Sequence, residues 1–112
     1  MTLQIATDKP VDGVVVIRPQ GEVDMEVSPG LRQALRSAFD GKPKRVVMHL
    51  KEVPYIDSSG IAVLVEGLQW SKKTGVAYSL AECSPQVKGV IDLARLSKIF
   101  TVCATLEEAT KP

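Results

Sequence analysis

The chain has 112 residues, of which 45% are hydrophobic. It contains 14 Lys and Arg residues and 13 Asp and Glu residues. This length suits one compact domain, and the net charge of +1 gives no field that would recruit nucleic acid or an anionic membrane. Aromatic residues are only 4% of the chain, which leaves few platforms on which nucleic-acid bases could stack.

The first residues lack a basic region followed by an apolar stretch, and the longest apolar run, 61–65, is far shorter than the roughly 20 residues that cross a bilayer. We therefore expect a cytoplasmic protein without membrane insertion. Cys83 and Cys103 do not form a Cys-x-x-Cys pair, and a single histidine cannot complete a zinc site with them. Two buried, reduced thiols are favoured over a disulfide.

The first half of the chain predicts a hairpin, a helix and a strand. Asp12-Gly13 separates two extended segments, 3–7 and 14–18, which indicates a hairpin over about 3–18. Ser28 before Pro29 has the pattern of a helix cap, and apolar residues recur at helical spacing as far as about residue 39. The short apolar segment 44–50 predicts a buried strand.

A second helix is predicted over 58–74, because this segment has no proline and Gly75 closes it. Its apolar residues fall at positions i, i+3, i+4 and i+7: Ile61, Leu64, Val65 and Leu68.

The remaining elements complete an alternating pattern. A strand is expected at 76–81, and Ser84-Pro85 then opens a third helix. A short strand at 100–102 and a brief helix over about 105–111 follow, the latter opened by Thr105 with Glu108 three residues on. This order predicts an α/β fold: a single domain over 1–112 with a mixed sheet and helices packed mainly on one face.

The turn into the second helix reads Asp57-Ser58-Ser59-Gly60 and follows a strand, the position where sites in α/β sheets tend to lie. Asp57 or Ser58 could simply cap the helix. A cap does not explain Gly60, which costs a helix about 0.5–1 kcal/mol relative to Ala. Gly60 therefore indicates that something approaches the backbone closely.

The two serines of this turn lie on different faces of the predicted helix. At 100° per residue, Ser58 falls near the apolar stripe and Ser59 falls on the opposite face, together with Val63, Glu66 and Trp70. We expect Ser59 to point outward. A phosphate there would meet the amide groups and dipole of the helix N-terminus, and it would add a charge of about −1.5 to −2.

These residues resemble a known family. Segments 46–50 (Val-Val-Met-His-Leu) and 53–61 (Val-Pro-Tyr-Ile-Asp-Ser-Ser-Gly-Ile) look like the STAS-domain anti-sigma-factor antagonists, which are bacterial partner-switching regulators. Segments 21–24, 96–100 and 105–109 also match the family pattern. The Asp-Ser-Ser-Gly element is the specific part, and the likeness covers nearly the whole chain, which implies a single STAS domain.

The resemblance implies a phosphorylation switch. In that family an ATP-dependent serine kinase, which is also an anti-sigma factor, phosphorylates the second serine of the motif, and a PP2C-type phosphatase reverses the reaction. Ser59 would therefore be the phospho-acceptor, with Ser58 as the alternative, and the unphosphorylated protein would bind the kinase. ATP and metal would belong to the kinase, so no cofactor is expected here.

Partner contact is expected around the acceptor, from Asp24, Asp57, Ser58, Gly60, Ala62, Val63 and Glu66. Asp24 and Asp57 would frame the acceptor by analogy, although each could instead be an ordinary loop or capping carboxylate. Ala62 and His49 depart from the family pattern, which often has glycine and a short polar residue at these positions. We expect His49 to be structural. Trp70 could join Val63 in an exposed partner surface or pack against a neighbouring element.

Two other functions are weighed against the switch. A STAS subunit of a transport or scaffold complex would use the same helix face constitutively. An enzyme is disfavoured because the chain has no Gly-x-Ser-x-Gly elbow and no phosphate-binding Gly-x-x-x-x-Gly-Lys loop, and His49 is its only imidazole. The expected role is therefore signal transduction and regulation of transcription through protein binding.

Overall fold

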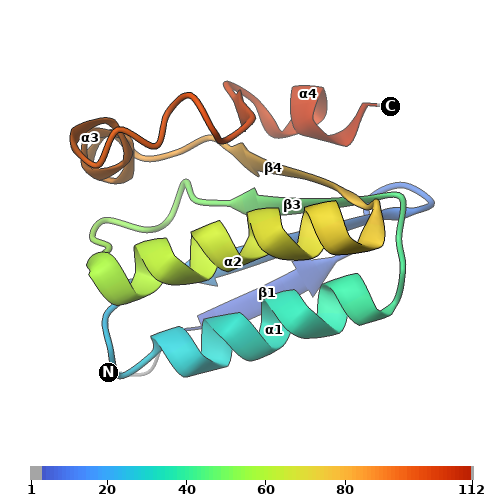
Figure 1. Cartoon of the computed structure of the whole chain (residues 1–112), viewed down its shortest axis with the longest axis horizontal. Coiled ribbons are helices and arrows are strands. Elements are labelled where there is room, and N and C mark those ends of the chain that lie inside the picture. The colour runs from blue at the N-terminus through green and yellow to red at the C-terminus, as the bar shows by residue number, and fades with distance from the viewer. Residues whose placement is uncertain (1–3, 112) are drawn as a thin grey trace.

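The computed structural model describes residues 4–111 and contains, within them, a five-stranded sheet and four helices (Figure 1). The strands are β1 (Gln4–Asp8), β2 (Val14–Gln20), β3 (Arg45–His49), β4 (Ala77–Ala81) and β5 (Val102–Cys103). The helices are α1 (Ser28–Asp40), α2 (Ser58–Thr74), α3 (Pro85–Leu93) and α4 (Leu106–Thr110). Strand order follows chain order: β1 and β2 are antiparallel and the other neighbours are parallel, so the mixed α/β sheet is confirmed.

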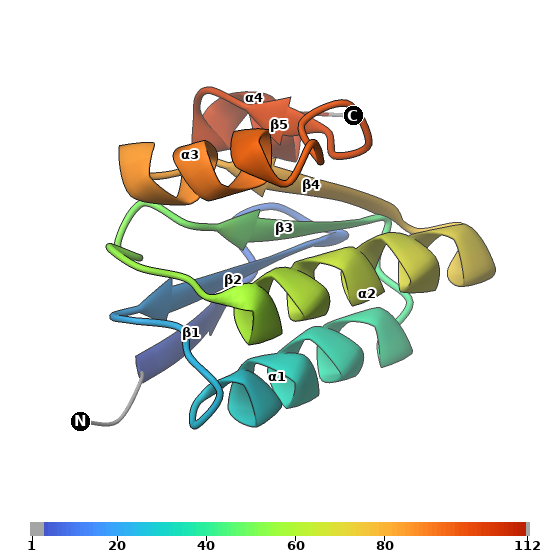
Figure 2. The same cartoon turned by 60° about the vertical axis from the view of Figure 1, so that its left-hand side comes forward.

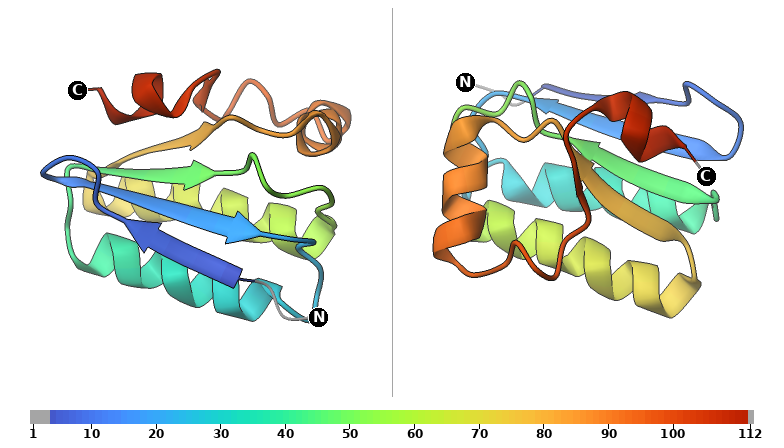
Figure 3. Two further views of the ribbon diagram at one scale, coloured as in Figure 1. Left: turned by 180° about the vertical axis from the view of Figure 1, so that it is seen from behind. Right: turned by 90° about the horizontal axis from the view of Figure 1, so that it is seen from above.

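The helices divide unequally between the two faces of the sheet. Helices α1 and α2 lie side by side on one face, and α3 extends this layer near β4 (Figure 2). Helix α4 packs on the opposite face, over β3 and β4 (Figure 3). The expectation that helices pack mainly on one face is thus confirmed. None of the helices in the described part of the chain has the length and apolar character that crossing a bilayer requires.

The central strands are buried on both sides, which explains their uninterrupted apolar sequence. In β2, Val15 and Ile17 enter the core beneath α1 and α2, whereas Val14 and Val16 join the cluster under α4. Successive side chains of a strand point to opposite faces, so a strand between two helix layers needs apolar residues at every position.

Most of the predicted elements are present within about two residues of the expected bounds. Two differ in detail. The last strand is Val102–Cys103 rather than 100–102, and Leu3, placed in the first strand, lies outside the described residues. Ser84 and Thr105 do cap α3 and α4, accepting bonds from the amides of Val87 (3.3 Å) and Glu108 (3.1 Å).

The prediction that Ser28 caps α1 is wrong. Ser28 is already inside the helix, the cap position is Val27, and no side chain caps that position. The Ser28 hydroxyl instead donates to the carbonyl of Asp24 at 2.6 Å, and the residue is only 2% exposed. Burial against α2 therefore takes this side chain away from the capping role that its type and its neighbour Pro29 suggest.

The buried face of α2 is rotated from the predicted stripe. Its buried residues are Gly60, Val63, Leu64 and Gly67, whereas Ile61, Val65 and Leu68 are only half-buried. Val63 is 0% exposed, so the prediction that it belongs to a partner surface is wrong. Gly60 and Gly67 lie on the side of α2 that packs most closely. The predicted stripe is drawn through large apolar residues and therefore does not include them.

Gly67 lets α2 approach the sheet, since a Cβ at this position would overlap the ring of Tyr78, whose hydroxyl donates to the carbonyl of Leu64 at 3.1 Å. We expect Gly67→Ala to lower the free energy of unfolding by about 1–3 kcal/mol through overpacking. Gly89→Ala is the matched control, because nothing lies within 4 Å of a Cβ there. It should stabilise α3 by about 0.5–1 kcal/mol. Urea unfolding of both variants measures the difference, and equal effects would contradict this account of Gly67.

Candidate functional site

Two loops at the carboxyl ends of β2 and β3 are joined through their backbones. The amide of Val23 donates to the carbonyl of Tyr55 at 2.9 Å, and the amide of Asp57 donates to the carbonyl of Val23 at 3.0 Å. Val23 and Ile56 form an isolated parallel bridge. Residues that follow two different strands, Asp24 and Asp57 among them, are thereby brought together beside the first turn of α2.

Gly60 is the point at which α2 rests on these joined loops. A Cβ at Gly60 would lie 2.5 Å from Cγ1 of Ile56 and 2.7 Å from Cγ1 of Val23. The close approach inferred from the sequence is therefore real, but the chain's own loops make it. Because Gly60 is buried, a partner cannot touch it, and the expectation that it contacts a partner is wrong.

Asp57 is the N-cap of α2. Its Oδ1 accepts hydrogen bonds from the amides of Ser59 (2.9 Å) and Gly60 (3.3 Å) and from the hydroxyl of Ser59 (2.5 Å). The hydrogen bond from the Ser59 hydroxyl, with the backbone amides of Gly60, Ser59 and Met25, holds the pKa of Asp57 below its usual value despite partial desolvation. Asp57 is therefore an ionised carboxylate at neutral pH.

Ser59 does not point outward, as the helical wheel predicted. It is half-buried, and its Oγ lies 2.8 Å from Oγ of Ser28 on α1, whereas Ser58 is exposed. The helical-wheel prediction for Ser59 is wrong for two reasons. The contact face of α2 includes glycines, and α1 covers the side of α2 that carries Ser59. The hydroxyl that the motif singles out thus sits in the seam between α1 and α2.

The hydroxyls of Ser28 and Ser59 have two protons for three oxygen contacts. These contacts join Ser28 to the Asp24 carbonyl (2.6 Å), Ser28 to Ser59 (2.8 Å), and Ser59 to Asp57 (2.5 Å). The Asp24 carbonyl and the Asp57 carboxylate can only accept hydrogen bonds. If one hydroxyl donates its proton to the other, its contact with the carbonyl or the carboxylate has no proton. The Ser59 hydroxyl can therefore exchange partners without becoming unpaired.

The Asp24 side chain forms hydrogen bonds within the loop that leads into α1. Its Oδ1 accepts from the amides of Glu26 (3.0 Å) and Val27 (3.3 Å). Asp57 is thus a capping carboxylate and Asp24 is a loop carboxylate, which are the ordinary roles left open for them beside that of framing the acceptor. The Asp57 carboxylate contacts the Ser59 hydroxyl directly, whereas Asp24 is linked to it only through its backbone carbonyl and the hydroxyl of Ser28.

The surface around Ser59 combines polar and apolar groups. Ser58 and Ala62 are exposed on α2, and Glu66 is half-buried and paired with Arg32. Met25 and Tyr55, on the joined loops, are 75% and 49% exposed. The sequence reasoning missed these two, although a large apolar side chain next to a polar motif in a loop is a recognisable signal.

His49 and Trp70, whose roles the sequence does not settle, both pack against other side chains. His49 is only 6% exposed, and its Nε2 lies 3.2 Å from Oε1 of Glu82, whose Oε2 accepts the amide of Leu106 at 2.7 Å. The amide of Leu106 and the ring of His49 hold the pKa of Glu82 below its usual value. Trp70 is half-buried, with the cations of Arg36 and Lys73 each 5.6 Å from its ring.

Both cysteines are free thiols, half-buried rather than buried as expected. Desolvation raises the pKa of Cys83 to about 11, so its sulfur is protonated at neutral pH and is a poor nucleophile. Within residues 4–111, no group of three or more His, Cys, Asp or Glu side chains could hold a metal ion.

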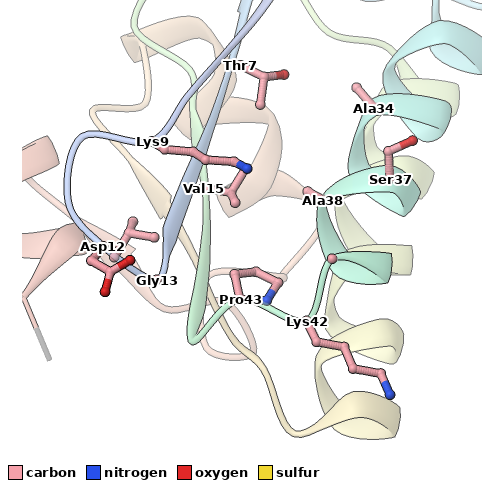
Figure 4. Close-up of a pocket in the computed structure, with 12 residues that line it drawn as sticks. Thr7, Lys9, Asp12, Gly13, Val15, Ala34, Ser37, Ala38, Lys42 and Pro43 are labelled. Carbon is pink, nitrogen blue, oxygen red and sulfur yellow. The ribbon is translucent and has the colours of Figure 1, made fainter.

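A pocket of about 460 Å³ lies between the β1–β2 turn and the end of α1 (Figure 4). Lys9 and Lys42 bring positive charge to it, Asp12 brings negative charge, and Val15 and Ala38 form part of its wall. Because β2 and β3 are parallel and begin here, the pocket is at the end of the sheet opposite to Ser59. It contains none of the predicted site residues, so the Ser59 turn remains the candidate site.

Removing the cap is expected to destabilise the protein in a pH-dependent way. Asp57→Ala should cost about 1 kcal/mol of unfolding free energy at pH 7. Because the folded pKa of Asp57 is lowered, its contribution is complete above the ordinary value of 3.8 and is lost as the pH falls through the folded value. Urea unfolding at pH 7 and at about pH 3 measures the change. Ser58→Ala is the control, and a cost at Asp57 that is the same at both pH values would argue against a charged cap.

Comparison with known proteins places the chain in one family. Residues 6–109 match the STAS domain. The anti-sigma-B factor antagonist of Bacillus subtilis is 33% identical over 78% of this chain and 79% of that protein. The anti-sigma F factor antagonist of Paenibacillus polymyxa is 27% identical over 80% of this chain and 78% of that protein. The crystal structure of an anti-sigma factor antagonist from Mycobacterium paratuberculosis superposes with a TM-score of 0.87 and 27% identity. The match covers 96% of this chain and 91% of that chain. The chain belongs to the STAS domain family.

Proposed function

We propose that this chain is an anti-sigma factor antagonist that binds an anti-sigma serine kinase while Ser59 is unmodified, and that phosphorylation of Ser59 releases it. The relatives named above are anti-sigma factor antagonists, which supports the general role. The observation that carries the assignment is the Ser59 hydroxyl held 2.5 Å from the Asp57 carboxylate at the N-terminus of α2.

This geometry favours Ser59 over Ser58 as the acceptor. The ionised Asp57 takes the hydroxyl hydrogen bond of Ser59, which orients the Ser59 oxygen and provides a proton acceptor when that oxygen attacks a phosphoryl group. A phosphate on this oxygen stays within the positive field of the α2 N-terminus. Asp57 would still cap α2 through the Ser59 and Gly60 amides, so the fold survives the modification.

The kinase would dock on the exposed groups around Ser59. Met25, Tyr55, Ser58 and Ala62 offer an apolar and neutral surface on two loops and one helix turn. Methionine and aromatic side chains are enriched at protein interfaces. A phosphate carries a charge of about −1.5 to −2 and must be desolvated before a partner can cover it, so it opposes docking on this surface.

The remaining parts of the switch lie in partner proteins. The kinase supplies ATP and its metal ion, and a PP2C-type phosphatase restores the free hydroxyl, so the chain acts in the cytoplasm as a binding module rather than as an enzyme. A second role, as a constitutive subunit of a STAS scaffold or transport complex, uses the same exposed loops without modification of Ser59. The two roles differ in whether native protein carries phosphate.

The phosphorylation site can be tested directly. We expect intact-mass and peptide analysis of protein purified from its own cells to find phosphate on Ser59, and phosphatase treatment to remove it. In vitro, ATP and a candidate anti-sigma kinase from the same genome should modify the wild type and Ser58→Ala but not Ser59→Ala. Phosphate on Ser58 would overturn the site assignment, and its absence under all conditions would favour the scaffold role.

Binding should respond to charge at Ser59 rather than to loss of the hydroxyl. Ser59→Ala should bind the kinase about as well as the wild type. Ser59→Asp places a second carboxylate beside Asp57 and should weaken binding by about tenfold or more. Calorimetry with the purified kinase measures both affinities, and equal affinity of the two variants would contradict the switch.

The exposed loop residues give a separate test of the docking surface. Met25→Ala and Tyr55→Ala should each weaken kinase binding by about tenfold, because truncating an anchoring side chain commonly costs more than 1 kcal/mol. Leu93→Ala is the matched control, since Leu93 is 87% exposed but is the last residue of α3, at the opposite end from Ser84, which contacts the loop after β3. If Leu93→Ala weakened binding as much as the loop variants, the surface would have been placed wrongly.

A further inference from the structure

The seam between α1 and α2 carries a row of paired side chains that begins at Ser59. Ser28 and Ser59 meet first, with their oxygens 2.8 Å apart. Further along, Nε of Arg32 lies 2.9 Å from both carboxylate oxygens of Glu66, and one terminal nitrogen of Arg32 lies 2.8 Å from Oε2. Helices α1 and α2 run side by side in the same direction (Figure 1), so the two pairs follow one another along the seam between them.

We propose that Arg32 is the counter-ion of a phosphate on Ser59, and that on phosphorylation Arg32 leaves Glu66 and pairs with the phosphate. This inference rests on the proposed function, because it concerns the modified form of the same serine. It assigns Arg32 a role in positioning the phosphate and Glu66 a role as the group that holds Arg32 in the unmodified protein.

The position of Arg32 lets it reach in either direction. At a rise of about 1.5 Å per residue, Arg32 lies about 6 Å beyond Ser28 along α1, and Glu66 lies about 10 Å beyond Ser59 along α2. Because Ser28 and Ser59 touch, the Cα of Arg32 is level with a point between Ser59 and Glu66. Its long side chain now extends forward to Glu66, and a rotamer change turns it back toward Ser59.

Charge favours this exchange. The side chains of Arg32 and Glu66 are 39% and 27% exposed, and ion pairs in such surroundings are weak because water competes for both groups. A phosphate carries a charge of about −1.5 to −2 and accepts the same two-pronged hydrogen bonds from a guanidinium. The Asp57 carboxylate, 2.5 Å from the Ser59 oxygen, repels a phosphate on that oxygen, which favours a position toward α1, the helix that carries Ser28 and Arg32.

The exchange would extend the effect of one phosphate along α2. In the unmodified protein the Arg32–Glu66 pair is neutral as a unit. After the exchange, the phosphate is only partly neutralised and Glu66 has lost its cation, so negative charge is present at two points about 10 Å apart on one helix. A partner that covers this helix would then meet negative charge at both points.

The test uses protein with phosphoserine installed at position 59 during translation, which requires neither the kinase nor any partner. Phosphorus NMR over a pH series gives the second pKa of the phosphate. A nearby cation favours the dianion, so we expect this pKa to be higher in Arg32→Gln than in the unsubstituted phosphoprotein, by about one unit. Arg36→Gln is the matched control, one helix turn further from Ser59, and should change the pKa much less.

Three further measurements separate pairing from a merely structural role. Arg32→Lys keeps the charge and should restore part of the pKa difference, and Glu66→Gln, which frees Arg32, should lower the pKa further. The Nε–H resonance of Arg32 should move between the unmodified and phosphorylated proteins. Equal pKa values for Arg32→Gln and Arg36→Gln would overturn the inference. Because the phosphate is installed independently of any kinase, that result would leave the proposed acceptor and partner untouched.

Discussion

The close contact between Gly60 and the joined loops is the constraint on which the site depends. Val23 and Ile56 occupy the space that any side chain at position 60 would need, and their bridge ties the loop after β2 to the loop after β3. With no Cβ in the way, the first turn of α2 can rest directly on this bridge. The cap carboxylate of Asp57 and the hydroxyl of Ser59 therefore have defined positions in a region built from two loops and a helix end.

The same contact decides where Ser59 points. Once Gly60 and Gly67 face the loops and the sheet, the rotation of α2 about its axis is set, and Ser59 turns toward α1 rather than toward solvent. Helix α1 is then part of the site through Ser28 and Arg32, although neither belongs to the Asp-Ser-Ser-Gly motif. Ser59 therefore lies beside a second helix that supplies both a hydroxyl and a cation.

The division between what the sequence predicts and what it does not follows the range of the interactions. Gly75, Ser84 and Thr105 act on neighbouring residues, so the ends of three helices could be predicted from them. Contacts between Ser28 and Ser59 or between Arg32 and Glu66 join residues more than 30 positions apart, and no local pattern encodes them. The helical wheel gives the wrong orientation for Ser59 because glycines form part of the contact face of α2. The prediction that Ser28 caps α1 is wrong because Ser28 is buried against α2.

A tightly seated helix end limits how a modification there can act. Since Gly60 leaves no space and Asp57 keeps its two amide bonds without the Ser59 hydroxyl, a phosphate has little scope to refold the turn and must act through charge. Salt screens exposed charges over about 8 Å at physiological ionic strength, which confines the direct field of the phosphate to the first turns of α2. A cation that moves between Glu66 and the phosphate changes the charge beyond this range. The pairing along the seam would therefore determine how much of the helix surface responds to one modified serine.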